Sequence, residues 1–128
     1  MKKFLVLVTI FSSLVSAKYI GTYYAKLGTS DHFNSHGTRL TKAAEIIRQD
    51  RYNYHIRGIR DAADEWDPFF ASKRNRDILE RMLKKGSSSG SALSAIVNGT
   101  PLIKVKVYND HINVTVIKSK KREKSSIK

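Results

Sequence analysis

Two runs of alternating apolar and polar residues near the carboxyl end constrain the fold of this chain most strongly. Every second residue is apolar in residues 102–108, and residues 111–117 repeat the pattern. A period of two places these residues on one face of a strand. The pair Asn109-Asp110 between the runs suits a two-residue turn. The sequence therefore predicts a β-hairpin whose buried face carries Ile103, Val105, Val107, Ile112, Val114 and Val116.

Three segments carry apolar residues at helical spacing and are expected to cover this face. Residues 39–54 follow Thr38, which suits a helix N-cap. The apolar run 92–97 is expected to form a short helix, with a short strand that leads into a turn as the alternative. Between them a helix is predicted to begin at Asp67-Pro68 and to end at Gly86. Ser72 offers a second starting point, so this segment is one bent helix or two short ones.

The first elements of the proposed domain are a strand and a loop. Residues 18–27 are rich in tyrosine and β-branched residues, and Tyr19, Tyr23 and Ala25 alternate along one face. Turn-forming residues then fill 28–37. We expect an α+β fold: a small single domain with two to three helices packed on a short antiparallel sheet that includes the carboxy-terminal hairpin.

The amino terminus has the pattern of an export signal. Lys2-Lys3 precede the apolar stretch 4–15, and the small residues Ser16-Ala17 follow it. This stretch is too short to cross a hydrocarbon layer of about 30 Å. We expect residues 1–17 to be a cleavable signal peptide and the protein to be periplasmic or secreted. Because the chain contains no cysteine, residues 18–117 must fold without disulfides, which suits a bacterial envelope.

The chain is strongly basic, with a formal net charge of +13 at pH 7. Residues 118–128 contain one acidic residue, Glu123, and are expected to form a disordered tail. The tail residues expected to contact an anionic surface are Lys118, Lys120, Lys121, Arg122 and Lys124. Such a tail favours anionic lipid, lipopolysaccharide or an acidic polymer as partner. Nucleic acid is not expected, since no groove-reading motif and no basic strand with interleaved aromatic residues is present.

The loop 28–37 contains the residues that suggest metal chemistry. Asp31, His32 and His36 are candidate ligands of a divalent transition metal. The glutamate that follows the first histidine in zinc proteases is replaced here by Phe33, and Ser35 lacks the glycines of a nucleophile elbow. Catalytic residues are therefore not identified, and no cofactor is expected unless this metal site exists.

A second candidate site would join this loop to the end of the first helix. His32, Asn34, Arg51 and His55 would line a small polar pocket for an anion or a sugar hydroxyl. Alternatively, Arg51 makes structural contacts that fasten the loop to the helix. The acidic segment 59–67 is expected to form surface ion pairs, and its Trp66 is expected to be buried with Phe69 and Phe70.

Two functions are weighed from these features. The first is an exported, non-catalytic envelope protein that binds an anionic or polar partner through its basic surface and tail. The second is a small hydrolase, with or without a metal ion, centred on His32 and His36. A role as an inhibitor or effector of another protein would require exposed aromatic residues at 66–70.

Overall fold

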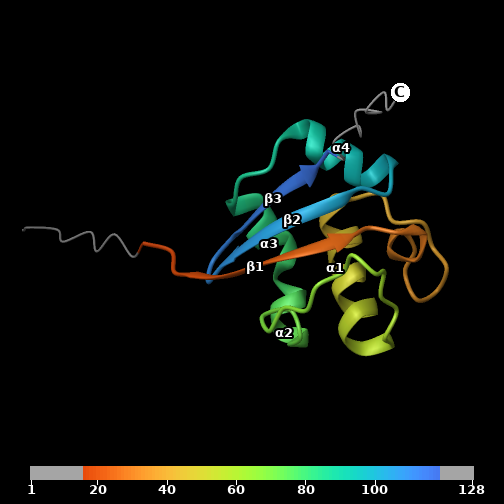
Figure 1. The fold of residues 1–128 in the computed structure, drawn as a ribbon, viewed down its shortest axis with the longest axis horizontal. Coiled ribbons are helices and arrows are strands. Elements are labelled where there is room, and N and C mark those ends of the chain that lie inside the picture. Colours follow the sequence, from red (N-terminus) through yellow and green to blue (C-terminus); the bar gives the residue numbers. More distant parts are fainter. Residues whose placement is uncertain (1–15, 119–128) are drawn as a thin grey trace, which may run out of the picture.

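The computed structural model describes residues 16–118 and contains a three-stranded antiparallel sheet, as the sequence predicts. The strands are β1 (Tyr19–Lys26), β2 (Leu102–Tyr108) and β3 (Ile112–Ile117). They lie side by side in the order β1-β2-β3 (Figure 1). The register pairs Val105 with both Tyr23 and Val114, so alternate residues of all three strands share a face. The predicted α+β class and carboxy-terminal hairpin are confirmed.

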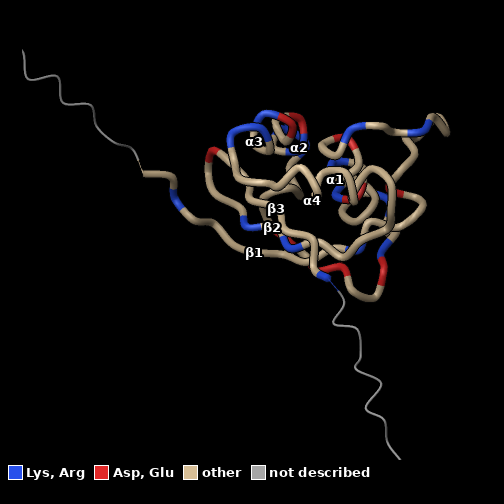
Figure 2. The backbone as a smooth tube through the Cα atoms, turned by 90° about the horizontal axis from the view of Figure 1, so that it is seen from above, with Lys and Arg blue, Asp and Glu red and all other residues tan. Residues whose placement is uncertain are grey.

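Helices cover one face of this sheet. The helical elements are η1 (Thr29–His32), α1 (Ala43–Tyr52), η2 (Asn53–Arg57), α2 (Lys73–Asp77), α3 (Leu79–Lys85) and α4 (Gly90–Asn98). The two perpendicular views agree that the helices lie on one side of the strands (Figures 1 and 2). Helices α3 and α4 contact β3, and α1 contacts both of them. The other side of the sheet has no helix among the described residues.

The core lies between the inner face of the sheet and the helices. The strands contribute Tyr23, Ala25, Ile103, Val105, Val107, Ile112 and Val114. The helices and their connections contribute Ile46, Ile47, Phe70, Leu79, Met82 and Ile96. Burial of one such large apolar side chain stabilises the fold by about 1.5–3 kcal/mol. The absence of cysteine is therefore compatible with one well-packed core.

Loop backbone covers both outer edges of the sheet. At the β1 edge, the Glu65 N–H donates to the Tyr24 carbonyl at 2.8 Å, and the Tyr24 N–H donates to Glu65 Oε1 at 2.9 Å. At the β3 edge, the Val114 N–H donates to the Ser87 carbonyl at 3.2 Å, and the Ser87 N–H donates to Asn113 Oδ1 at 2.7 Å. These contacts occupy part of each outer edge and so hinder pairing with another chain there.

The first long helix begins later than predicted. Helix α1 starts after Lys42, whereas Thr38 does not cap it. Residues before Lys42 are held against the loop, because Phe33 and Arg39 form a β-bridge and the Leu40 N–H donates to the His32 carbonyl at 2.8 Å. At its other end the helix continues into the π-turn η2, which stops at Gly58 with a φ of 66°.

Asp67-Pro68 does not begin a helix. The Asp67 carboxylate instead accepts the N–H of Phe70 at 2.6 Å and forms a turn. The helix starts at Lys73 with Ser72 as its N-cap, which makes two short helices, α2 and α3. The short helix predicted over 92–97 is confirmed as α4.

Two side-chain predictions are wrong. Trp66 is 62% exposed, although Phe70 is buried as expected. Its neighbours are held by other contacts: the Glu65 carboxylate accepts the Tyr24 N–H, and the Asp67 carboxylate accepts from Arg51. Tyr19 does not share the buried face of Tyr23, because a register shift between Tyr19 and Gly21 reverses the alternation in β1.

Candidate functional site

The four residues predicted to line a polar pocket do not meet in one place. Arg51 and His55 meet at the Asp67 carboxylate, with Arg51 Nη1 and His55 Nε2 at 2.7 and 2.9 Å from Oδ1. The His32 ring lies instead between two carbonyl oxygens, those of Gly28 at 2.7 Å and Ile96 at 2.8 Å. Asn34 Oδ1 accepts backbone N–H groups within its own loop. The structure therefore brings together Arg51 and His55 only.

The candidate metal ligands are either hydrogen-bonded to other groups or exposed to solvent. Asp31 accepts the Gly28 N–H at 3.0 Å and the Asn53 amide at 2.9 Å, while His36 is exposed. Burial raises the pKa of the Asp31 carboxyl, and the hydrogen bond from Asn53 opposes this effect. Within residues 16–118 no three His, Cys, Asp or Glu side chains are placed to hold a metal ion together.

A buried arginine cluster surrounds Arg51, whose side chain is fully buried. Arg51 Nε donates to Asp50 Oδ2 at 2.8 Å, and Nη1 donates to the Glu65 carbonyl at 2.9 Å as well as to Asp67. The guanidinium carbon lies 4.1 Å from the ring centre of Tyr23 and 4.7 Å from that of Tyr54. Two carboxylates and two aromatic rings offset the cost of burying this charge.

The charged groups of the arginine cluster are buried and interact with one another. Burial raises the pKa of Asp50 well above its ordinary value, and the charge of Arg51 opposes this shift. Burial likewise raises the pKa of Tyr23. Within the described chain, Arg51 Nη2 and Tyr23 Oη are buried without a hydrogen-bond partner. The cluster fastens residues 65–67, rather than the loop 28–37, to α1 and β1.

Carboxylates of the acidic segment 59–67 accept hydrogen bonds from backbone N–H groups more than they pair with basic side chains. Asp64 Oδ1 accepts the Lys26 N–H at 2.8 Å, and Asp64 Oδ2 accepts the Asp61 N–H at 2.7 Å. The Glu65 carboxylate accepts the Tyr24 N–H. In the part of the chain that the structure describes, neither of these two carboxylates forms an ion pair with a side chain, whereas Asp67 pairs with the buried Arg51. The predicted surface ion pairs are therefore replaced by contacts that hold the segment on β1.

The side of the sheet away from the helices is basic and aromatic. We call this the outer sheet face; its residues are Tyr19, Thr22, Tyr24, Lys26, Leu102, Lys104, Lys106, Tyr108, Asn113, Thr115 and Ile117. The three strands contain lysines but no Asp or Glu (Figure 2). Lys26 and Lys106 are exposed, and the Lys104 ammonium lies 6.0 Å from the ring centre of Tyr24.

Aromatic rings gather at the hairpin end of the outer sheet face. The rings of Tyr19 and Tyr108 meet edge to face with centres 5.5 Å apart, and His111 stacks on Tyr108 at 4.3 Å. Tyr19 reaches this position because of the register shift in β1. The sequence of each strand taken alone therefore does not predict that these rings lie together. The alternation of the lysines with Ile103, Val105 and Val107 is nevertheless visible in the sequence.

Comparison with protein-family models, curated proteins and solved structures finds no match for this chain. Among the residues described, no helix has both the length and the apolar character needed to cross a membrane.

Proposed function

We propose that this protein is an exported, non-catalytic envelope protein that binds an anionic surface, with anionic lipid as the principal partner. The outer sheet face and the tail 118–128 are its binding surface. The observation that carries the proposal is the composition of the outer sheet face, where lysines and tyrosines stand together without a carboxylate.

The geometry of this face suits contact with an extended surface. Loops contact both sheet edges, and the helices lie on the opposite side, so no helix covers this face in the described chain. The nearest acidic side chains along β1, those of Asp64 and Glu65, accept backbone N–H groups of this strand. Lysine ammonium groups on the face therefore keep their charge available for a phosphate or carboxylate partner.

The basic tail follows β3 in the sequence. Strand β3 ends at Ile117, which pairs with Leu102 on the outer sheet face, and Lys118 is exposed immediately after it. The remaining tail residues Lys120, Lys121, Arg122 and Lys124 lie outside the described residues. Each basic residue near an anionic membrane contributes about 1 kcal/mol.

Removing two charges from the outer sheet face is expected to weaken membrane binding strongly. The variant Lys104→Gln/Lys106→Gln loses about 2 kcal/mol of attraction, which is roughly a thirtyfold lower partition coefficient. The measurement is co-sedimentation of residues 18–128 with vesicles of anionic phospholipid across a salt series. This segment contains every helix and strand of the structure. Binding falls as salt rises, since added ions screen these charges.

A matched variant separates local charge from total charge. Lys73→Gln/Arg74→Gln removes two exposed charges from α2 on the helical side and is expected to change binding less than threefold. Equal loss in the two variants would contradict a role for the outer sheet face. Comparison with residues 18–117 measures the contribution of the tail. Binding to an acidic polymer but not to vesicles would identify that polymer, rather than lipid, as the partner.

A further inference from the structure

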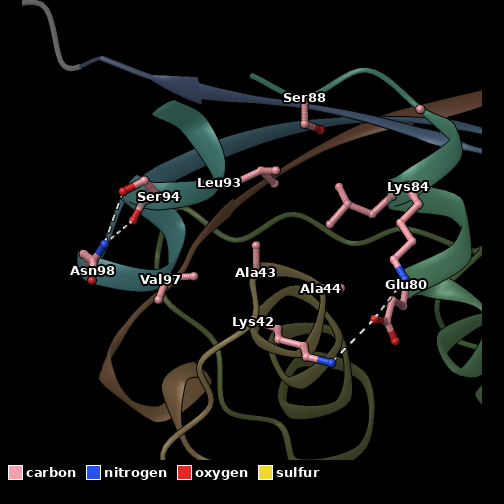
Figure 3. Close-up of a pocket in the computed structure, with 12 residues that line it drawn as sticks. Lys42, Ala43, Ala44, Glu80, Lys84, Ser88, Leu93, Ser94, Val97 and Asn98 are labelled. Atoms are coloured by element: carbon pink, nitrogen blue, oxygen red, sulfur yellow. Dashed lines mark hydrogen bonds and ion pairs between the residues drawn. The ribbon is translucent and has the colours of Figure 1, made fainter. Parts of the chain in front are cut away.

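A groove on the helical side of the molecule, apart from the outer sheet face, has an apolar floor. It lies between the start of α1, the end of α3 and one side of α4, and has a volume of about 720 Å³ (Figure 3). Leu93 and Val97 of α4 face Ala43 of α1 across it, and Ala44 and Leu83 also line it. Sites for small molecules are apolar hollows of about 300–1,000 Å³. The size and lining of this groove fit that class.

One end of the groove is positively charged. The ammonium groups of Lys42 and Lys84 lie 4.0 and 3.6 Å from the same oxygen of Glu80 (Figure 3). Two lysines thus share one carboxylate, and more than half of each lysine side chain is exposed. The first turn of α1 borders the same end, and no side chain caps it. The positive end of the helix dipole adds to the attraction for an anion.

A polar group inside the groove also lacks a partner. Ser88 Oγ is buried and makes no hydrogen bond to any described residue, and Ser88 lines the groove. A buried hydroxyl without a partner costs free energy. An occupant that offers a polar atom near this hydroxyl would remove that cost.

We propose that this groove binds a single-chain anionic amphiphile. Its acyl chain lies on the floor formed by Ala43, Leu83, Leu93 and Val97, and its anionic head lies between Lys42 and Lys84. Charge complementarity selects this occupant, because an apolar floor that ends in two lysines matches a molecule with an apolar tail and one anionic end. Glu80 competes with the head group for both lysines.

The test is calorimetric titration of residues 18–128 with dodecanoate below its micelle concentration. We expect saturable binding at one site, at least about tenfold tighter than that of the cationic analogue dodecyltrimethylammonium. Dodecyl phosphate is expected to bind like dodecanoate, which would assign recognition to the anionic charge shared by both heads. Inorganic phosphate alone is expected to show no binding, since it lacks the apolar part.

Variants at the charged end are expected to change the affinity in opposite directions. Lys42→Glu/Lys84→Glu weakens dodecanoate binding at least about tenfold, whereas Glu80→Gln strengthens it about threefold by removing the competing carboxylate. All three side chains are largely exposed, so the fold is retained. Circular dichroism confirms this for each variant.

The matched control is Lys106→Glu on the outer sheet face. It makes the same kind of charge change away from the groove and is expected to leave dodecanoate binding unchanged, while it lowers vesicle binding. Equal affinity for the anionic and cationic probes, or no effect of the lysine variants, would overturn the groove proposal. Loss of vesicle binding with dodecanoate binding intact would contradict only the proposal for the outer sheet face. The two proposals can therefore fail independently.

Discussion

Replacing Arg51 with methionine is expected to lower the free energy of unfolding by about 3–5 kcal/mol at neutral pH. Methionine retains much of the length of the side chain but cannot pair with Asp50 and Asp67, which are both buried. The loss therefore comes chiefly from carboxylates left without a counter-ion. Urea unfolding of residues 18–128, followed by circular dichroism, measures it.

The pH dependence of this loss identifies its origin. Burial already raises the pKa of Asp50, and Arg51 opposes the shift, so removal of Arg51 raises this pKa further. A carboxyl whose pKa is higher in the folded state destabilises that state at a pH above this raised pKa. The destabilisation decreases as the pH falls below the folded-state pKa and is lost at the unfolded-state pKa. The difference between variant and parent is expected to be smaller at about pH 5 than at about pH 8. An equal difference at both values would show that packing alone is lost.

Arg48→Met is the matched control in the same helix. Arg48 is half exposed and pairs with Asp77 at the surface. Exposed ion pairs contribute little, so the expected loss is below about 1 kcal/mol. A loss comparable to that of Arg51→Met would contradict the distinction between the buried and the exposed arginine.

The parts of the fold that the sequence predicts well are those that depend on local periodicity. The hairpin follows from strict alternation around Asn109-Asp110, because a one-residue slip would expose every apolar side chain. Helix α4 likewise follows from a short apolar run with a serine before it. In both cases the pattern of apolar residues and the tertiary environment favour the same structure.

The parts that the sequence does not predict depend on contacts between distant residues. Arg48 and Arg51 look alike in the sequence, and only the approach of Asp67 and Tyr23 from other segments makes Arg51 a buried residue. The predicted start of the first helix is wrong for a similar reason. Arg39 is drawn into a bridge with Phe33, so the capping preference of Thr38 is overridden by pairing within the loop.

The candidate sites also combine features that the local sequence predicts with features that depend on contacts between distant residues. Charge composition alone indicates an anionic partner, but the grouping of the lysines with Tyr19 and Tyr108 requires the register of three strands and the shift in β1. The groove is less predictable still. Its floor combines residues from α1, α3 and α4, and none of these helices presents a recognisable binding motif.

Replacing Gly86 with alanine is expected to destabilise the fold by at least about 3 kcal/mol, with a fall in Tm of more than about 10 °C. A Cβ at this position would lie 1.7 Å from the Ile112 carbonyl oxygen and 2.6 Å from its carbon. Both are backbone atoms of β3, so no side-chain rotation relieves the contact. The end of α3 would have to move away from the strand that it covers, and thermal unfolding measures the consequence.

Gly90→Ala is the control, because an added Cβ there meets no atom within 4 Å. Gly90 is the first residue of α4, where alanine restricts the unfolded chain and favours the helix. The expected change is a gain of about 0.4–1 kcal/mol, opposite in sign to that of Gly86→Ala. The φ of Gly86 is −84°, which alanine adopts without strain, so the backbone conformation does not require glycine at this position. The predicted loss therefore measures the close approach of α3 to β3, and a Gly86→Ala variant as stable as the parent would show that this approach is absent in solution.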